Sequence, residues 1–360
     1  MKILFISRAY PPTVGGIENQ NYELGKWLSE ISETKVLANK KGKRFLPFFL
    51  PYASAMTILT MHKYDALLLG DGVLGVTGWI SKFFYPQKPV ICVVHGLDLT
   101  FPSRFYQKVW VNFFLKRIDK FIAVGNETIN VGEEKKLGRE KFMFIPNGVD
   151  TEKHLCESTR AELEKVLGVP VSDKKIMLTA GRLAKRKGVA WFVKNVMPKL
   201  SSDFTYVVSG DGPDKENILN AIKEEQLSER VLMLGYVTDE VRNTLLNTAD
   251  LFLQPNIKIP GDMEGFGISV IEAGACRLPV LASNMEGLKD AIKDGKNGFL
   301  VESENADAYV QKINELFAKG SPREIYGQTV RDFVVENYQW EKIAKQYSEE
   351  IRKTIAELKN

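Results

Sequence analysis

Short apolar runs alternate with longer stretches of helical periodicity along most of this chain. The runs are apolar at nearly every position, which is typical of strands in a parallel sheet with both faces covered. Each run precedes a segment with the apolar spacing of a helix, as in βαβ units. We therefore predict an α/β fold with two doubly wound lobes. The predicted strands are residues 2–7, 66–70, 90–95 and 120–125 in the first lobe and 175–181, 204–210, 231–236, 251–255 and 279–283 in the second.

A turn-rich segment, residues 146–175, separates the two series of strands. It opens with Pro-Asn-Gly and contains a second proline and only a short helical stretch, as an interdomain connection would. We place the boundary near residue 165, which gives an N-terminal domain of residues 1–165 and a C-terminal domain of residues 166–339. The tail, about residues 340–360, carries isoleucine or tyrosine at every fourth position from Ile343 and is predicted to be an amphipathic helix.

The composition excludes several classes of protein. With 360 residues, 44% hydrophobic and 26% charged, the chain suits a globular protein of two domains, and no uninterrupted apolar run reaches the roughly 18 residues of a membrane span. The N-terminal MKILFIS is typical of a first strand and not of a signal peptide, so we expect a cytoplasmic protein. A net charge of +4 gives no support for nucleic-acid binding. The histidines His62 and His154 are expected at the surface.

Three scattered cysteines, with no CxxC or histidine-rich spacing, indicate neither a disulfide framework nor a zinc site. Candidate chemistry is therefore sought elsewhere. Open parallel sheets bind ligands beyond the carboxyl ends of their strands, which directs attention to the residues that follow each predicted strand.

In the first lobe, Gly15 and Gly16 lie between the first strand and a helix. They form either a simple turn or a site where the backbone approaches an anionic ligand at a helix N-terminus, and we favour the second. His95 ends a buried strand on the crevice side, where an imidazole can hydrogen-bond a hydroxyl. Asp98 either belongs to the same site or caps the next helix.

In the second lobe, Arg182 directly follows the first strand and Lys187 precedes a glycine and a helix. A guanidinium grips phosphate with two hydrogen bonds and an ammonium adds a point charge, so these two residues predict an anion clamp. Lys185 and Arg186 are expected to be solvated. Gly210 opens the tight turn GDGP, whose backbone can also approach a ligand.

The stretch EGFGISVIE holds two carboxylates, Glu264 and Glu272. In a continuous helix they would stand about 12 Å apart, whereas the acid and nucleophile of a retaining glycosidase need about 5 to 5.5 Å. They suit instead the two ends of an elongated ligand with a diphosphate between them at the helix start. A nucleotide sugar has this layout. The backbone groups expected to face the diphosphate belong to Gly265, Phe266, Gly267 and Ile268.

This stretch, followed by EAGACRLPVLAS and GLKDAIKDGKNGFLV, resembles the donor-binding region of the retaining glycosyltransferases of family 4, which have the GT-B fold. The resemblance extends over nearly the whole chain through the glycine pair, HGLDL, PNGVD, GRLAKRKG, GDGP and the tail helix, in that order. It implies two Rossmann-like domains that face each other across a cleft, with the C-terminal helix packing back on the N-terminal domain. The N-terminal domain would bind the acceptor and the C-terminal domain the nucleotide sugar.

The resemblance also implies roles for single residues. The matches to Arg182, Lys187 and the EGFG backbone hold the diphosphate, that to Glu264 lies near the transferred sugar, and that to Glu272 binds the ribose. The matches to Gly16 and His95 line the reaction centre.

The implied reaction transfers a hexose or N-acetylhexosamine from a UDP- or GDP-sugar with retention of configuration, in the synthesis of cell-envelope polysaccharide or glycolipid. No carboxylate is placed as a nucleophile, so the departing diphosphate is expected to help deprotonate the acceptor hydroxyl. We expect no cofactor and no metal, because the chain has no D-x-D motif. The segment NIKIPGDM before Glu264 departs from the family pattern and leaves open the shape of the loop at the sugar pocket.

Two segments, residues 39–52 and 101–117, interleave basic and aromatic residues. They suit docking to an anionic membrane surface, or else the aromatics belong to the core and the basic side chains are solvated. Docking would place the protein on the cytoplasmic face of the membrane with a lipid-linked sugar or phospholipid headgroup as acceptor. The basic residues assigned to this surface are Lys40, Lys41, Lys43, Arg44, Arg104 and Lys108.

Two other functions remain open from the sequence. A nucleotide-sugar 2-epimerase of the same fold would act without an acceptor, and a non-catalytic nucleotide-sugar-binding protein would keep the phosphate and ribose contacts. A nicotinamide dehydrogenase is disfavoured, because G-x-G-x-x-G is missing after the first strand.

Overall fold

The computed structural model describes residues 1–13 and 15–358, and the chain forms two compact units. The first unit comprises residues 1–148 and 340–360, and the second residues 149–339. The boundary predicted near residue 165 lies too late in the chain. Helix α6 (Arg160–Leu167), which contains residue 165, packs on α9 (Asp239–Thr248) within the second unit, so the turn signals around Pro170 precede a strand and do not separate domains.

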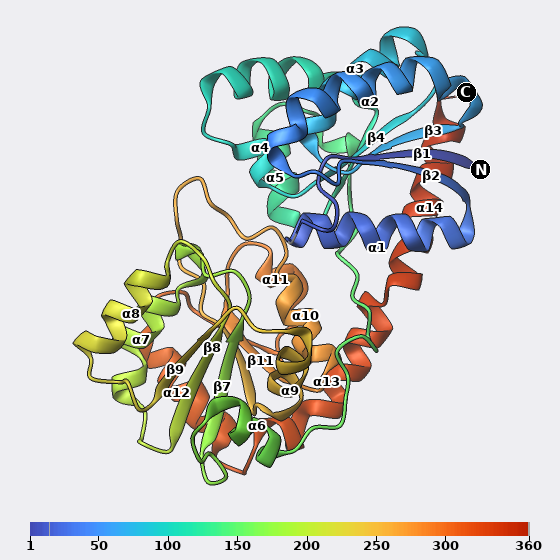
Figure 1. The fold of residues 1–360 in the computed structure, drawn as a ribbon. Helices are drawn as coiled ribbons and strands as arrows, with labels where there is room; N and C mark the ends of the chain where they lie inside the picture. Colours follow the sequence, from blue (N-terminus) through green and yellow to red (C-terminus); the bar gives the residue numbers. More distant parts are fainter. Residues whose placement is uncertain (14, 359–360) are drawn as a thin grey trace. The chain divides into compact units, whose positions relative to one another are not determined.

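The first unit is built on a parallel sheet of six strands in the order β2-β1-β3-β4-β5-β6 (Figure 1). Its strands are β1 (Lys2–Ser7), β2 (Glu33–Ala38), β3 (Ala66–Leu69), β4 (Val90–Val94), β5 (Lys120–Ala123) and β6 (Phe142–Phe144). Its α-helices are α1 (Gly16–Ile31), α2 (Leu46–Thr60), α3 (Gly75–Phe84), α4 (Leu97–Thr100), α5 (Asn126–Glu134) and α14 (Trp340–Glu357). Shorter or wider helical turns are η1 (Lys43–Phe45), η2 (Met61–Lys63), η3 (Gly72–Leu74), the π-helix η4 (Tyr106–Phe114), η5 (Leu115–Arg117) and η6 (Arg139–Lys141).

The second unit repeats this architecture, with a parallel sheet in the order β12-β11-β10-β7-β8-β9. Its strands are β7 (Lys175–Ala180), β8 (Phe204–Ser209), β9 (Val231–Gly235), β10 (Leu251–Gln254), β11 (Val280–Ser283) and β12 (Phe299–Val301). Besides α6 and α9, its helices are η7 (Lys185–Lys187), α7 (Val189–Asn195), η8 (Met197–Lys199), α8 (Lys215–Glu224), α10 (Ile268–Ala275), α11 (Leu288–Ala291), α12 (Ala306–Phe317) and α13 (Pro322–Tyr338).

The predicted α/β class with two parallel sheets is confirmed, and every predicted strand is present. Three strands were not predicted: β2, β6 and β12. β2 lies at a sheet edge and alternates exposed with half-buried residues, while β6 and β12 are edge strands of three residues. An apolar run marks a strand buried on both faces and is weak at an edge.

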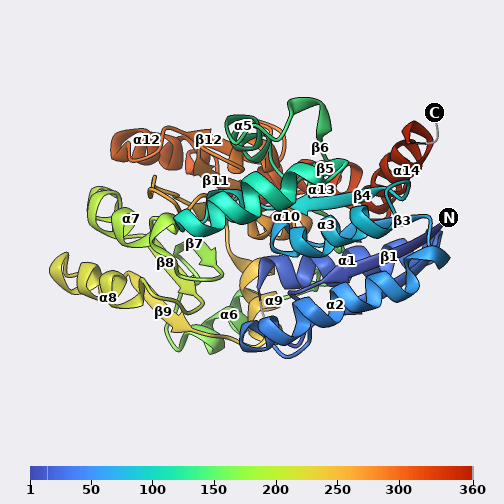
Figure 2. The ribbon, with the colours of Figure 1, turned by 90° about the horizontal axis from the view of Figure 1, so that it is seen from above.

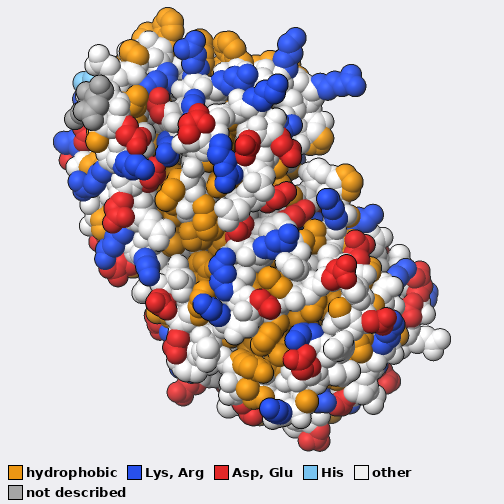
Figure 3. Space-filling view, turned by 180° about the vertical axis from the view of Figure 1, so that it is seen from behind, with side chains coloured by type: hydrophobic (Ala, Val, Ile, Leu, Met, Phe, Trp, Pro, Cys, Tyr) orange, Lys and Arg blue, Asp and Glu red, His pale blue; other side chains and the backbone are white. Residues whose placement is uncertain are grey.

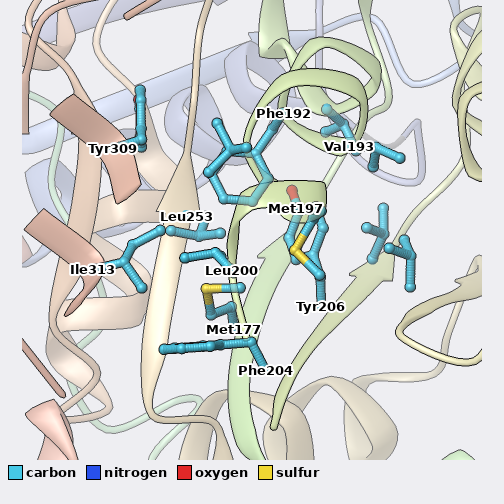
Figure 4. Packing of buried hydrophobic residues seen from close by; sticks show 14 of the residues in the cluster. Met177, Phe192, Val193, Met197, Leu200, Phe204, Tyr206, Leu253, Tyr309 and Ile313 are labelled. Atoms are coloured by element: carbon cyan, nitrogen blue, oxygen red, sulfur yellow. The ribbon is translucent and has the colours of Figure 1, made fainter. Parts of the chain in front are cut away.

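A buried aromatic cluster in the core of the second unit packs against three neighbouring strands, β7, β8 and β10 (Figure 4). The Phe192 ring of α7 packs on the rings of Tyr206 and Tyr309, with centroids 5.1 and 5.6 Å away. The Tyr206 hydroxyl lies 2.7 Å from the Thr179 hydroxyl, which donates to the Leu253 carbonyl. This network joins β7, β8 and β10, the neighbouring strands where the sheet order reverses.

The tail helix α14 belongs to the first unit and packs on α1. Its buried face contains Ile343, Tyr347 and Ile351 at intervals of four residues, as the spacing predicted. The fully buried Trp340 anchors its first turn, and Glu350 forms an ion pair of 3.2 Å with Lys120 at the start of β5.

Helices α2 and α3 lie side by side on the first sheet (Figure 2). The continuous helical stretch Lys43–Lys63 has a mean hydropathy of 1.2 and is the one helix within residues 1–13 and 15–358 that could cross a membrane by length and composition. This is weak evidence for a span, because core helices meet the same criterion. α2 buries Phe49 and Ala53 and exposes Phe48, Tyr52 and Leu59.

Candidate active site

The sheet order of the first unit reverses between β1 and β3, so the loops after these strands and after β4 meet at one edge. Arg8, directly after β1, pairs with the fully buried Asp71 after β3 at 2.9 Å. Asp71 also caps η3 by accepting from the Val73 N–H at 2.9 Å. This pair was not predicted from the sequence, because neither residue lies in a motif. It locks together the loops that surround His95.

Asp98 is buried, and its carboxylate is fully used within the first unit. It accepts the backbone N–H groups of Gly72, His95 and Gly96 at 2.9, 3.0 and 2.9 Å. Burial raises the pKa of Asp98, while His95 and these N–H groups oppose the shift. Asp98 therefore ties the loop after β3 to the loop after β4. The predicted acceptor contact of the Asp98 side chain stays a prediction, and the hydrogen bonds show that the residue holds these two loops together.

His95 is half-buried, and its Nε2 lies 3.1 Å from the Gly70 carbonyl. A carbonyl accepts only, so the bond requires a proton on Nε2. In the neutral ring, Nδ1 is then left as an acceptor for a ligand hydroxyl. His95 directly follows β4, as predicted, and its contact with a ligand stays a prediction.

The glycine pair lies at the start of α1, where Gly15 is the N-cap and Gly16 the first helical residue. No side chain caps this helix. Asn21 on the first turns of α1 donates to the Ser7 hydroxyl at 2.9 Å and to the Gly70 carbonyl at 3.3 Å. The α1 N-terminus is thus fixed to the same strand ends that carry Arg8 and His95. We call Arg8, Asp71, His95 and Asp98 the first-unit cluster.

In the second unit, Arg182 follows β7 and its side chain is exposed. It forms no ion pair with any residue that the structure describes. The GDGP turn lies against its loop: a Cβ on Gly210, whose φ is +130°, would stand 1.8 Å from the Gly181 carbonyl oxygen. Gly210 therefore supports the loop that presents Arg182, and only glycine fits there.

The largely buried Lys187 forms an ion pair with the buried Glu264, with Nζ 2.7 Å from Oε2. Burial raises the pKa of Glu264, but the positive charges of Lys187 and Arg186 outweigh it and hold that pKa at about 2. Burial lowers the pKa of Lys187, against the attraction of Glu264. Asn256 donates a further hydrogen bond to the Glu264 carboxylate at 3.3 Å. The two residues predicted to hold diphosphate and sugar are thus direct neighbours.

Arg186 was expected to be solvated, and this is wrong. Its side chain is largely buried, with Nε 3.3 Å from Asp262 and Nη1 3.6 Å from Glu264. Asp262 lies in the segment NIKIPGDM that departs from the family pattern. The pair with Asp262 explains the burial, because it joins the turn after β7 to the loop that leads to Glu264.

Helix α10 begins at Ile268 behind Gly267, whose φ of +91° favours glycine. No side chain caps the helix, so its first N–H groups are available to an anion. Gly265 precedes the buried Phe266, whose ring packs on Tyr338 at 5.8 Å. Phe266 can therefore offer a ligand only its backbone, as predicted. Glu264 itself lies before the helix and not on it.

Glu272, on the second turn of α10, pairs with Arg242 of α9 at 2.5 Å. The Glu272 charge raises the pKa of Arg242. His154, expected at the surface, is instead buried beside them, with Nδ1 2.8 Å from Asn243 Oδ1, and burial lowers its pKa. Neither Arg242 nor His154 lies in a motif that would have signalled it. We call Arg182, Arg186, Lys187, Glu264, Glu272 and Arg242 the second-unit cluster.

The basic residues assigned to a docking surface are all exposed: Lys40, Lys41, Lys43, Arg44, Arg104 and Lys108. Lys41 lies 4.7 Å above the ring of Phe45. Large apolar side chains of α2, α3 and η4 are exposed on the same unit, among them Phe48 at 68% and Phe83 at 70%. On the face shown in Figure 3, hydrophobic side chains reach the surface among lysines and arginines.

Within residues 1–13 and 15–358, no group of three histidine, cysteine, aspartate or glutamate side chains could hold a metal ion. The second-unit cluster instead places Arg186 and Lys187 beside one carboxylate, that of Glu264. Metal-independence stays a prediction.

Two family models match the chain. "Glycosyltransferase Family 4" matches residues 14–153, and "Glycosyl transferases group 1" matches residues 161–333. The first range holds His95 and the second range holds the whole second-unit cluster.

Similar proteins have related descriptions. The capsular polysaccharide biosynthesis glycosyltransferase CapM of Staphylococcus aureus is 25% identical, with 96% of each chain covered. The UDP-Gal:alpha-D-GlcNAc-diphosphoundecaprenol alpha-1,3-galactosyltransferase of Escherichia coli is 27% identical over 72% of this chain and 68% of its own. The solved structure of Anabaena Alr3699/HepE in complex with UDP has a TM-score of 0.79 at 20% identity, covering 98% of this chain and 100% of that one.

Proposed function

Since this chain is an enzyme that belongs to the family 4 glycosyltransferases of GT-B fold, we propose that it transfers a hexose or N-acetylhexosamine from a UDP- or GDP-sugar with retention of configuration. The acceptor is a hydroxyl of a glycan or lipid-linked sugar in the synthesis of cell-envelope polysaccharide or glycolipid. Relatives described as a capsular polysaccharide glycosyltransferase and a diphosphoundecaprenol-linked galactosyltransferase support this class of acceptor.

The observation that carries the proposal is the order of charged groups in the second-unit cluster. The uncapped start of α10 lies between Glu264 on one side and Glu272 on the other, and Arg182 and Lys187 supply positive charge. A nucleoside diphosphate sugar presents its groups in the same order: sugar hydroxyls, diphosphate and ribose hydroxyls. Backbone N–H groups and cations at the diphosphate would stabilise the negative charge that develops on the leaving group.

Glu264 is unsuited to act as an acid, because its pKa of about 2 keeps it ionised at neutral pH. It is also unsuited to act as a free nucleophile, because Lys187 and Arg186 both pair with its carboxylate. We assign it to holding hydroxyls of the transferred sugar and to orienting Lys187. The proton of the acceptor hydroxyl then passes to the leaving diphosphate, as the C–O bond to the donor breaks and the bond to the acceptor oxygen forms on the same face.

In the first unit, His95 offers Nδ1 as an acceptor for a sugar hydroxyl, and Asp98 and Arg8 hold its loop. We propose that the imidazole orients a hydroxyl of the donor sugar or of the acceptor. The start of α1 at Gly15 and Gly16 supplies backbone N–H groups, and Asn21 of the same helix bonds to the Gly70 carbonyl that His95 also contacts. The protein works at the cytoplasmic face of the membrane, where the exposed basic and aromatic residues of the first unit provide a peripheral contact.

The test is a transfer assay with UDP- and GDP-sugars, ranked first by thermal shift, and a panel of lipid-linked and free glycan acceptors. Transfer in the presence of EDTA, with an α-linked product from an α-linked donor by NMR, is the expected result. Release of an epimerised sugar without acceptor would favour a 2-epimerase. Donor binding without turnover across the panel would favour a non-catalytic binding protein.

A further inference from the structure

A pocket of about 510 Å³ opens in the first unit between the end of α4, the start of η4 and the end of α5. The side chains that matter for its chemistry are the cations Arg104, Lys108 and Lys135 and the polar Ser103 and Asn112. No aspartate or glutamate lines it. Three cations from two separate elements face one hollow, so the pocket suits an anionic group.

None of these cations is neutralised within the part of the chain that the structure describes. Some other basic residues of the first unit do have a carboxylate partner, such as Lys82 with Asp119 at 3.1 Å. No ion pair of Arg104, Lys108 or Lys135 occurs among residues 1–13 and 15–358, and all three lie at the pocket wall. Surface lysines are commonly unpaired, but convergence of three unpaired cations on one concave wall concentrates positive potential there.

Exposed apolar side chains occur in the pocket wall and on the segments that form it. Phe101 lines the pocket and is 47% exposed, and Phe105 beside Arg104 is 67% exposed. Leu97 and Phe113, on α4 and η4, expose further apolar surface. Exposed aromatic side chains beside a cationic hollow match an amphiphilic ligand that joins an anionic group to a hydrocarbon chain.

The position of the pocket relative to His95 is fixed by hydrogen bonds within the unit. α4 connects the His95 loop to the pocket wall at Thr100 and spans only about 6 Å. The Tyr106 hydroxyl donates to the Asp98 carbonyl at 2.8 Å, and Gln107 donates to the Leu99 and Phe101 carbonyls at 3.0 Å each. The segment of Arg104 and the start of η4, which carries Lys108, are thereby tied to α4. The pocket and His95 are therefore separated by little more than the length of α4.

We propose that this pocket binds the phosphate or diphosphate through which a lipid carries the acceptor sugar. The lipid chain leaves over Phe101 and Phe105, and the sugar extends toward His95. This inference rests on the proposed function, because it names the chemical class of that acceptor. It also assigns Lys135, which no pattern in the sequence had singled out, to acceptor binding.

Two measurements test the proposal, the first of which needs no catalysis. Isothermal titration of the whole protein with farnesyl diphosphate, with farnesol and with UDP separates the pocket from the donor site. The variant R104A/K108A/K135A is expected to weaken farnesyl diphosphate binding by at least tenfold and to leave UDP affinity unchanged. Farnesol, which lacks the anionic group, is expected to bind poorly to both proteins.

The matched control is K35A/K63A/R352A, which removes the same charge from exposed positions of the first unit outside the pocket. It is expected to bind farnesyl diphosphate like the unaltered protein. Equal weakening in both triple variants would overturn the proposal, since net charge alone would then explain the effect. Unchanged farnesyl diphosphate binding in the pocket variant would overturn it as well.

The second measurement compares a sugar acceptor linked through diphosphate to a short isoprenoid with the same sugar on an uncharged alkyl chain. The pocket variant, R104A/K108A/K135A, is expected to lower the ratio of kcat/KM for the diphosphate-linked acceptor to kcat/KM for the alkyl acceptor at least tenfold. The change should come from a higher KM for the diphosphate-linked acceptor. An unchanged ratio contradicts the proposal. A third outcome separates this proposal from the proposed function. If the unaltered protein transfers sugar to neither acceptor, but R104A/K108A/K135A binds farnesyl diphosphate more weakly than the unaltered protein, the proposed function fails and the phosphate site stands. The pocket variant could instead lose binding to phosphatidylglycerol vesicles and to farnesyl diphosphate equally, with an unchanged ratio of the two kcat/KM values. That result would overturn the proposal and make the pocket a membrane contact.

Discussion

Lys187 Nζ lies 2.7 Å from Glu264 Oε2, and the two side chains are only 12% and 9% exposed. A buried ion pair loses much of its Coulomb gain to desolvation, so its presence is better explained by orientation than by stability. Lys187 lies in the turn that follows β7, and Glu264 lies just before α10. The ion pair therefore sets the distance between the two loops that we expect to bind the donor. Removal of either partner is expected to destabilise the protein, because the charge of the other partner is then left buried and unpaired.

The fall in the free energy of unfolding at acidic pH is expected to depend on Glu264. Its pKa is about 2 in the folded state and about 4.3 in an unfolded chain, so the folded state binds fewer protons between these values. The stabilisation is complete above about pH 4.3 and is lost as the pH falls toward 2. Chemical denaturation from pH 7 to 2.5 should show E264Q less stable at pH 7, by up to about 3 kcal/mol, with the difference shrinking on acidification. A constant difference would contradict the assigned pKa.

Arg182→Ala is expected to lower turnover by roughly tenfold or more without a loss of stability. The side chain is exposed and has no ion-pair partner among the described residues, so its removal leaves no buried charge. The neighbouring exposed Lys185 provides the control, and Lys185→Ala should retain turnover. Steady-state kinetics and thermal unfolding of both variants check this. Equal kinetics in R182A and K185A would remove Arg182 from the diphosphate site.

Lys187→Ala, unlike Arg182→Ala, is expected to lower the stability of the protein as well as its turnover. It leaves the Glu264 carboxylate buried beside Arg186 alone, and breaking a buried pair on one side costs about 3–5 kcal/mol. Turnover and the unfolding midpoint should therefore both fall. The double variant K187A/E264Q, which removes both charges, should recover part of the midpoint and none of the turnover. Full recovery of turnover would show that Lys187 does not touch the donor.

The sequence predicted the parts of this fold and site that depend on local pattern. Continuous apolar runs located the buried strands, and glycine-bounded loops located Arg182, Lys187 and the α10 start. Pairings between distant segments were not predictable in this way. Arg186 finds its partner Asp262 across 76 positions of sequence and Arg242 finds Glu272 across 30, and no spacing rule connects them. The same limit applies to Lys135, which joins Arg104 and Lys108 only through the packing of α5 near η4.

Glu272→Ala is expected to raise the apparent donor KM and to change kcat little, because the assigned ribose contact is remote from the reacting carbon. The pair with Arg242 adds a second expectation: Arg242→Ala should raise the donor KM by a smaller factor, since Glu272 then keeps its charge and loses its orientation. Kinetics with varied donor at saturating acceptor would measure both. An unchanged donor KM in E272A would exclude the ribose role.

The exposed basic group before α2 gives the last prediction. Lys40, Lys41, Lys43 and Arg44 are all exposed, and each basic residue near an anionic surface contributes about 1 kcal/mol. Their joint replacement by alanine should weaken sedimentation with phosphatidylglycerol vesicles by roughly a hundredfold or more at low salt, and the difference should narrow as salt rises. Phe48→Ser removes exposed apolar surface from α2 instead, so its loss of binding should persist at high salt. K35A/K63A/R352A serves as the charge control, and equal binding of all variants to these vesicles would exclude membrane docking through this surface.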